Sequence, residues 1–76
     1  MNTHDAIKKM IRTSGKTQDG VSIELGKSKN WLSATFAAAN DSKASTVAAL
    51  CSKCGYALAL VPRDDLPNTA IEIDAI

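Results

Sequence analysis

Cys51 and Cys54 stand three residues apart, a spacing found both in zinc sites and in redox-active cysteine pairs. A zinc site needs about four ligands, but the sequence has no second cysteine pair, and its one histidine, His4, is far away in the chain. Redox-active pairs lie at a helix N-terminus, where the helix dipole lowers the thiol pKa, whereas this pair falls near the end of a predicted helix. We therefore expect both thiols to pack in the core and to bind no metal.

The rest of the sequence holds no Ser-His-Asp, paired-carboxylate or phosphate-loop pattern that would point to catalysis. His4 is close to the N-terminus, and we interpret it as a solvated side chain. A chain of 76 residues forms one small domain, in which a specialised enzyme site is hard to bury. We therefore expect no enzymatic activity and no cofactor.

Charge is distributed unevenly along the chain. Residues 1–55 hold eight Lys and Arg against four Asp and Glu, a net charge of +4, whereas residues 56–76 hold one Arg against four acids, a net charge of −3. A basic body with an acidic tail favours a polyanionic partner for the first part and a different role for the second. The alternative is an imbalance that arises by chance in a short chain.

Overall composition is that of a globular protein, with 45% hydrophobic and 22% charged residues. No apolar run approaches the roughly 20 residues of a membrane span, and the N-terminus does not resemble a signal peptide. We expect a soluble, cytoplasmic protein with no membrane partner.

Caps, stops and apolar spacing divide residues 1–55 into four predicted helices. The predicted helices run from a Thr3 cap to Gly15, from a Thr17 cap to Gly26, from a Ser28 cap to about Ala38, and from Lys43 to Cys54 before Gly55. After Gly55 the period changes to two, which predicts short strands at residues 56–61 and 69–74 around a loop with two prolines. The sequence therefore predicts a mostly α fold of four helices with a C-terminal pair of short β-strands.

The two short helices on either side of Gly26 form the most informative pattern. Two helices joined by a short turn that contains glycine are typical of the DNA-binding helix-turn-helix, whose second helix enters the major groove. Apolar residues at Val21, Leu25 and Leu32 would hold the two helices on a shared core.

Residues 17–33, TQDGVSIELGKSKNWLS, resemble the core motif of the lambda-repressor-like, Cro/Xre-type helix-turn-helix proteins. That motif has Thr-Gln, a small residue at the place of Ser22, a glycine four residues later, and then Ser before an aromatic residue. The resemblance covers about residues 3–60 and implies a lambda-repressor-like domain. The chain departs from the pattern at Gly20, at Ser22 in place of alanine, and at Lys27, and alanines replace longer polar residues late in the second helix.

The resemblance implies two sets of DNA-contacting residues. The expected base readers are Lys29, Asn30, Ser33 and Ala34. Lysine donates to guanine, asparagine pairs with adenine, and alanine meets only a thymine methyl group. The expected phosphate contacts are Thr17, Gln18, Lys27, Ser28 and Lys43. For each of these polar residues, the alternative is a solvated helix face.

The tail, residues 56–76, is predicted to join two chains. A single hairpin is marginal in water, because its apolar face and its edges are uncovered. The expected dimerisation residues are Leu58, Leu60, Ile71 and Ile73. The alternative is a hairpin folded back on the last helix of its own chain.

We thus expect residues 1–55 to be a double-stranded DNA-binding domain and residues 56–76 a dimerisation element. The expected function is that of a small transcriptional regulator, such as a repressor of phage, mobile-element or antitoxin type, which acts as a homodimer and has a toxin or other protein as a further possible partner. The alternative is a protein-interaction module that keeps the fold but has lost DNA binding, as the scarcity of basic residues at 34–42 would suggest.

Overall fold

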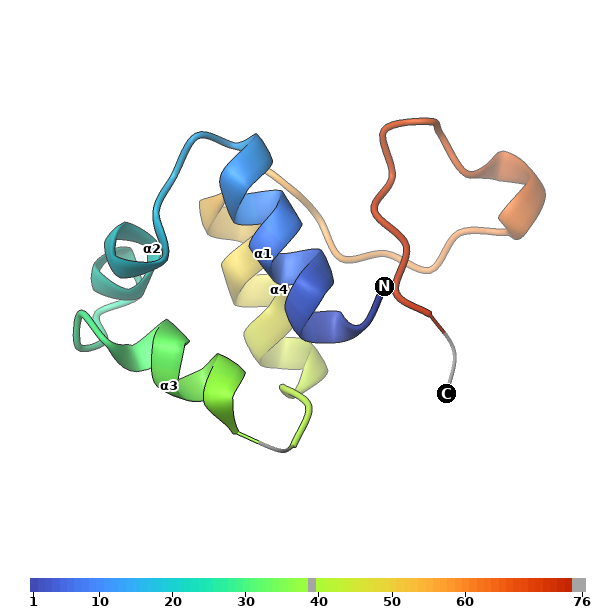
Figure 1. Cartoon of the computed structure of the whole chain (residues 1–76). Coiled ribbons are helices and arrows are strands. Elements are labelled where there is room, and N and C mark those ends of the chain that lie inside the picture. Colours follow the sequence, from blue (N-terminus) through green and yellow to red (C-terminus); the bar gives the residue numbers. More distant parts are fainter. Residues whose placement is uncertain (39, 75–76) are drawn as a thin grey trace.

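A computed structural model describes residues 1–38 and 40–74 of the chain (Figure 1). The helices are α1 (Thr3–Thr13), α2 (Gln18–Glu24), α3 (Trp31–Ala37) and α4 (Ala44–Lys53), and a single 3-10 turn, η1 (Arg63–Asp65), lies in the tail. The prediction of a mostly helical fold with four helices is confirmed.

Helix α1 is capped one residue earlier than the sequence predicted. The side-chain oxygen of Asn2 accepts a hydrogen bond from the backbone N–H of Asp5 at 2.8 Å, so Asn2 is the N-cap and Thr3 is already helical. One face of α1 is buried and carries Ala6, Ile7, Met10 and Ile11.

Glycines end α1, α2 and α4, as predicted. At the end of α2, Gly26 has a φ of 73°, which L-residues with side chains rarely adopt, and the next N–H, that of Lys27, donates to the carbonyl of Ser22 at 3.0 Å. The chain therefore turns sharply out of α2 while the last carbonyls of the helix stay paired. Gly15 and Gly55 end the other two helices with the same pattern.

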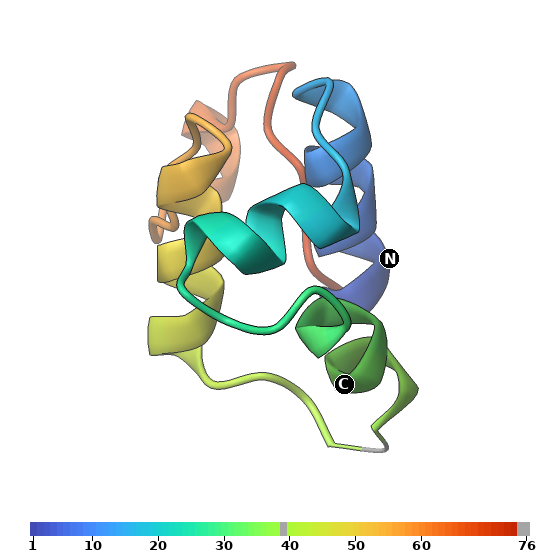
Figure 2. The same cartoon turned by 90° about the vertical axis from the view of Figure 1, so that its left-hand side faces the viewer.

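The core is one cluster to which every helix contributes. Helices α1 and α4 lie side by side, and α2 crosses in front of both of them (Figure 2). Helix α3 packs against α2. The buried cluster contains Ile7, Met10, Ile11, Val21, Leu32, Val47, Leu50, Cys51 and Cys54. None of these helices is long and apolar enough to span a membrane, over the residues that are described.

Both cysteines pack in this core, as predicted, with about 7% of each residue exposed. Burial, together with the neighbouring Cys54, raises the pKa of the Cys51 thiol above its ordinary value. Among residues 1–38 and 40–74, no group of three or more His, Cys, Asp or Glu side chains is placed to hold a metal ion.

The predicted pair of β-strands is wrong: the described part of the tail, residues 56–74, contains no strand. The two segments are separated by residues 62–68, where η1 and two prolines hold the chain in local turns, such as the one closed by the Asp65 N–H and the carbonyl of Pro62 at 2.9 Å. Instead of packing across a hairpin, Tyr56 and Ile71 pack in part against the helical core. The predicted alternative, a hairpin folded back on the last helix, is also absent from the described tail.

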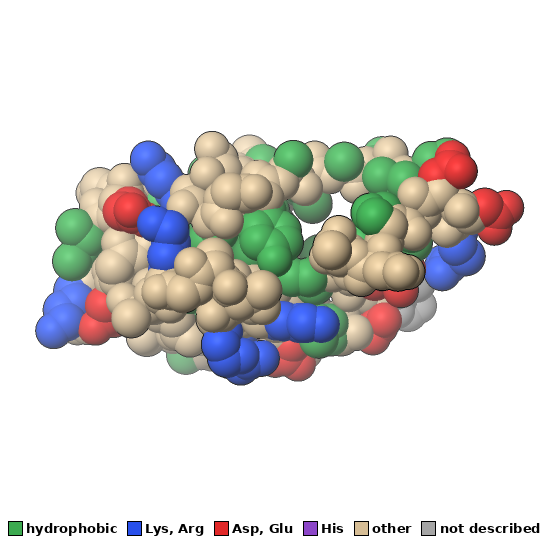
Figure 3. All heavy atoms as spheres, turned by 90° about the horizontal axis from the view of Figure 1, so that it is seen from above, with side chains coloured by type: hydrophobic (Ala, Val, Ile, Leu, Met, Phe, Trp, Pro, Cys, Tyr) green, Lys and Arg blue, Asp and Glu red, His purple; other side chains and the backbone are tan. Residues whose placement is uncertain are grey.

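The tail leaves a hollow between itself and the helices. From the end of α4 the tail loops away from the helical body and returns beside the start of α1 (Figure 1). There the N-terminal amino group pairs with the Asp74 carboxylate, and the Asp74 N–H donates to the Met1 carbonyl at 2.8 Å. The hollow has a volume of about 480 Å³ and is lined mostly by apolar residues of α1, α4 and the tail (Figure 3).

The predicted dimerisation residues differ in their surroundings. Leu58, Leu60 and Ile73 are exposed, and Leu60 is fully so, whereas Ile71 is half-buried against the core. The tail therefore presents apolar side chains to solvent within a single chain.

Candidate nucleic-acid interface

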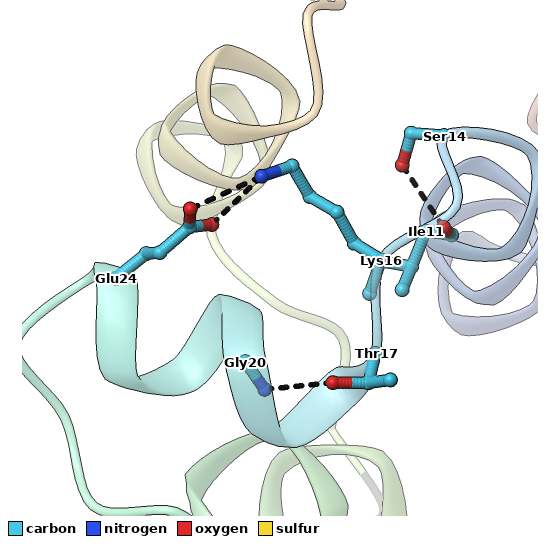
Figure 4. Close-up of polar contacts among 6 residues, drawn as sticks. All are labelled: Ile11, Ser14, Lys16, Thr17, Gly20 and Glu24. Carbon is cyan, nitrogen blue, oxygen red and sulfur yellow. Dashed lines mark hydrogen bonds and ion pairs between the residues drawn. The ribbon is translucent and has the colours of Figure 1, made fainter.

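The start of α2 is built as the sequence predicts. Thr17 is extended, with φ −113° and ψ 156°, and its hydroxyl oxygen accepts the Gly20 N–H at 3.0 Å (Figure 4). A Cβ at position 20 would stand 3.0 Å from the same oxygen, so the absence of a side chain at Gly20 leaves space for the capping hydroxyl. The Thr17 hydroxyl keeps its own hydrogen for a further acceptor. Gln18, the first residue of α2, is half-buried.

The start of α3 differs from the prediction. Ser28 does not cap the helix through its side chain; instead, its backbone carbonyl accepts the Trp31 N–H at 3.0 Å and closes a turn. The first α-helical hydrogen bond runs from Ala34 N–H to the Asn30 carbonyl, so the helix starts at Trp31 rather than near Lys29. The connection between α2 and α3 is therefore longer than expected, and Lys29 and Asn30 lie on it.

Helix α3 separates a buried side from an exposed one. Leu32 is completely buried, and Trp31, Thr35 and Phe36 are half-buried. Ser33 and Ala34, two of the predicted base readers, are exposed. The other two readers, Lys29 and Asn30, are exposed as well, just before the helix.

Two contacts bring the connection close to α2 and α3. The Lys29 ammonium lies 4.0 Å from the carboxylate of Asp19, in the first turn of α2. The Lys27 ammonium lies 5.7 Å from the centre of the Trp31 ring. The structure thus gathers Lys29 and the start of α2, where Thr17 and Gln18 stand, into one region of the surface.

A further ion pair fixes Lys16 along the side of α2. Its ammonium lies 3.0 and 3.2 Å from the two carboxylate oxygens of Glu24 (Figure 4). Both side chains are more than a third exposed, so solvent screens the pair and its contribution to stability is small. The pair links the segment before α2 to the last turn of that helix.

Lys43 stands apart from the other predicted phosphate contacts. It is the N-cap residue of α4 and is exposed, and none of the ion pairs among residues 1–38 and 40–74 includes Lys43. Ser28 and Lys27 are exposed on the connection before α3.

Sequence reasoning missed two features. The prediction that His4 is solvated is wrong: its ring is half-buried, with its centre 5.3 Å from that of Phe36, and the Lys8 ammonium lies 5.1 Å from the same Phe36 ring. The spacing of four between His4 and Lys8 on α1 is the only signal the sequence gives for this cluster. The second feature is Ser22, a buried hydroxyl between α2 and α3. The sequence signal for it was a serine at a position where the family pattern has alanine.

No family model, curated protein or solved structure matches this chain.

Proposed function

We propose that the protein binds double-stranded DNA in a sequence-specific manner, as a small transcriptional regulator with a lambda-repressor-like helix-turn-helix domain. The observation that carries the proposal is the division of α2, α3 and their connection into a buried and an exposed side. Val21 and Leu32 are completely buried where the two helices meet. The exposed residues of the connection and of α3 are small, polar or basic, which suits a surface that approaches a base-pair edge and a phosphate backbone, whereas α2 also exposes Ile23 and Glu24.

In this proposal α3 enters the major groove with its exposed side. Lys29 and Asn30 stand at its N-terminal end, from which recognition helices contact bases. Asn30 pairs with adenine and Lys29 with guanine, while Ser33 bonds either and Ala34 meets a thymine methyl group. The exposed side chains of α3, those of Ser33, Ala34 and Ala37, are small and let its backbone come close to the bases.

Phosphate contacts come from the residues around that groove. Thr17 and Gln18 stand at the start of α2, Lys27 and Ser28 on the connection, and Lys43 at the start of α4. For Lys29 to reach DNA, its contact with Asp19 has to open, at a cost of about 1 kcal/mol at most, because both side chains are largely exposed.

The proposal includes a homodimer formed through the tail. Leu58, Leu60 and Ile73 are exposed, and the segments that carry them make few backbone hydrogen bonds within the described chain. A second copy would cover these apolar side chains and remove them from water. The acidic residues of the tail would be repelled by phosphate, so the tail lies away from the DNA. Repression in a phage, mobile element or toxin–antitoxin pair, with a toxin as further partner, fits such a small dimer.

Two observations favour a second function, a protein-interaction module that no longer binds DNA. The exposed end of α3 carries Ala34, Ala37 and Ala38 and no basic residue. Lys16 and Lys29 are also engaged with acidic partners in the same chain.

Selection of bound sites from a pool of random duplexes tests both functions. We expect the full chain to enrich one motif, with an affinity that falls steeply as salt rises, since bound lysines release counterions from phosphate. Asn30→Ala should lose preference at one base pair, by about 1–3 kcal/mol, and keep its fold. Asn68→Ala, an exposed asparagine of the tail, is the matched control and should keep the full preference. If no motif is enriched and binding does not depend on salt, the interaction module is the better account.

A further inference from the structure

We propose that Ser22 is a positioning residue: its hydroxyl, on α2, caps the start of α3 and so fixes the orientation in which α3 is presented. The consequence for DNA readout rests on the proposed function, whereas the capping contact does not.

Ser22 is completely buried, and it is the one buried polar residue among those described. Its hydroxyl donates to the carbonyl of Gln18, one turn back in α2, at 2.9 Å. The same oxygen accepts the backbone N–H of Leu32, which is itself completely buried, at 3.2 Å. One hydroxyl thus uses its donor within α2 and its acceptor on α3.

Helix α3 depends on this contact because it has no cap of its own. The first N–H groups of any helix lack partners within the helix, and a side chain of the N-cap residue normally accepts one of them. Asn30 is of a type that caps well, but its φ of −94° and ψ of 6° are not the extended conformation that capping needs, and its side chain makes no cap bond with any described residue. The N–H of Trp31 is taken by the Ser28 carbonyl, so the N–H of Leu32 is the one that Ser22 satisfies.

The contact also sets the relative orientation of α2 and α3. Apolar packing between Val21 and Leu32 brings α2 and α3 together but allows small rotations, since dispersion contacts are not directional. A hydrogen bond from the first turn of α3 to the middle of α2 fixes their relative angle. Because phosphate contacts come from the start of α2 and base contacts from around the start of α3, that angle decides whether both can form at once.

The test uses the full chain, Ser22→Ala, and a matched control, Ser14→Ala. Ser14 also carries a partly buried hydroxyl that donates to a backbone carbonyl at 2.9 Å, that of Ile11, but it connects no two helices. We measure the hydrogen exchange of the Leu32 amide by NMR, and the ratio of affinities for the selected duplex and for random duplex.

Ser22→Ala should speed Leu32 exchange at least about tenfold relative to the Leu50 amide, and should lower the ratio of specific to random affinity by about tenfold, in line with the loss of one buried hydrogen bond. Ser14→Ala should change neither quantity. Ser22→Cys, whose thiol fills the site and is a weak donor and acceptor, should give intermediate values and covers the case in which the alanine variant does not fold.

Unchanged Leu32 exchange in Ser22→Ala would overturn the capping contact. Faster exchange with an unchanged affinity ratio would overturn its role in readout. A wild-type chain that prefers no duplex would overturn the proposed function and the readout role together, while the exchange measurement would still decide the cap.

Discussion

Asp19 should limit the affinity for DNA, because its carboxylate lies next to a proposed base reader. The distance of 4.0 Å to the Lys29 ammonium corresponds to an interaction of about 1 kcal/mol in a medium like water. The water value applies, since 71% of the Lys29 side chain and 47% of the Asp19 side chain are exposed. Asp19→Asn should therefore tighten DNA binding about fivefold at low salt, because it frees Lys29 and removes a charge that phosphate repels.

The same substitution should cost a little stability. An acid in the first turn of a helix interacts with the helix dipole by about 0.3–1 kcal/mol, and Asp19 occupies that place in α2. Asp19→Asn should thus tighten DNA binding but lower the free energy of unfolding. Measuring binding and unfolding on the same variant separates the two effects.

Fluorescence anisotropy with a labelled duplex at two salt concentrations is the assay. The matched control is Glu72→Gln, which also removes one carboxylate from an exposed ion pair, that with Arg63 at 3.6 Å, but in the tail. We expect tighter binding for Asp19→Asn alone, with the gain shrinking as salt rises. An equal gain in both variants would show that only net charge matters and would refute the local argument, as would no gain in Asp19→Asn.

Two further predictions concern the tail and the thiols. Truncation after Gly55 should give a helical monomer that binds DNA poorly, because two linked half-sites gain roughly 10²–10⁴ in effective concentration; a truncated chain that still sediments as a dimer would place the interface on the helices. The raised pKa of Cys51 means that the folded chain holds its thiol proton more tightly than the unfolded chain, so stability should be unaffected below the ordinary thiol pKa of 9.0 and should fall as pH rises above it. Denaturant unfolding of wild type and Cys51→Ala at several pH values checks this, and an equal fall in both would contradict it.

The helices were predictable where a local pattern determines them. In α1 the spacing of Ile7, Met10 and Ile11 identifies the buried face, and in α2 the Thr17 cap and the Gly26 stop identify both ends. The start of α3 was not predictable in this way. Ser28 is a favourable cap by residue type, but only its backbone carbonyl is used, in a turn. The side chain that caps α3 belongs to Ser22, so the cap depends on contact between α2 and α3 rather than on neighbouring residues.

In the tail, the local sequence pattern was not sufficient to predict the structure. The apolar run around Leu58 and the apolar–polar alternation around Ile71 both fit a strand, but a strand also needs a partner, and neither pattern says where the partner is. The exposure of Lys29, Asn30, Ser33 and Ala34 is what the family resemblance implied for these positions. The link that Ser22 makes could not follow from spacing, because the hydroxyl acts on a residue ten positions away in a different helix.

The division of α3 has a consequence for how such a protein can diversify. Positions 33, 34 and 37 are exposed, so a longer side chain at any of them extends into solvent and leaves the buried Leu32 undisturbed. Arginine, glutamine and lysine form helices nearly as well as alanine, and exposed substitutions usually change stability by about 0.5 kcal/mol or less. On the proposed function, new target sequences can therefore be acquired one substitution at a time, and none of these steps has to wait for a compensating change in the core.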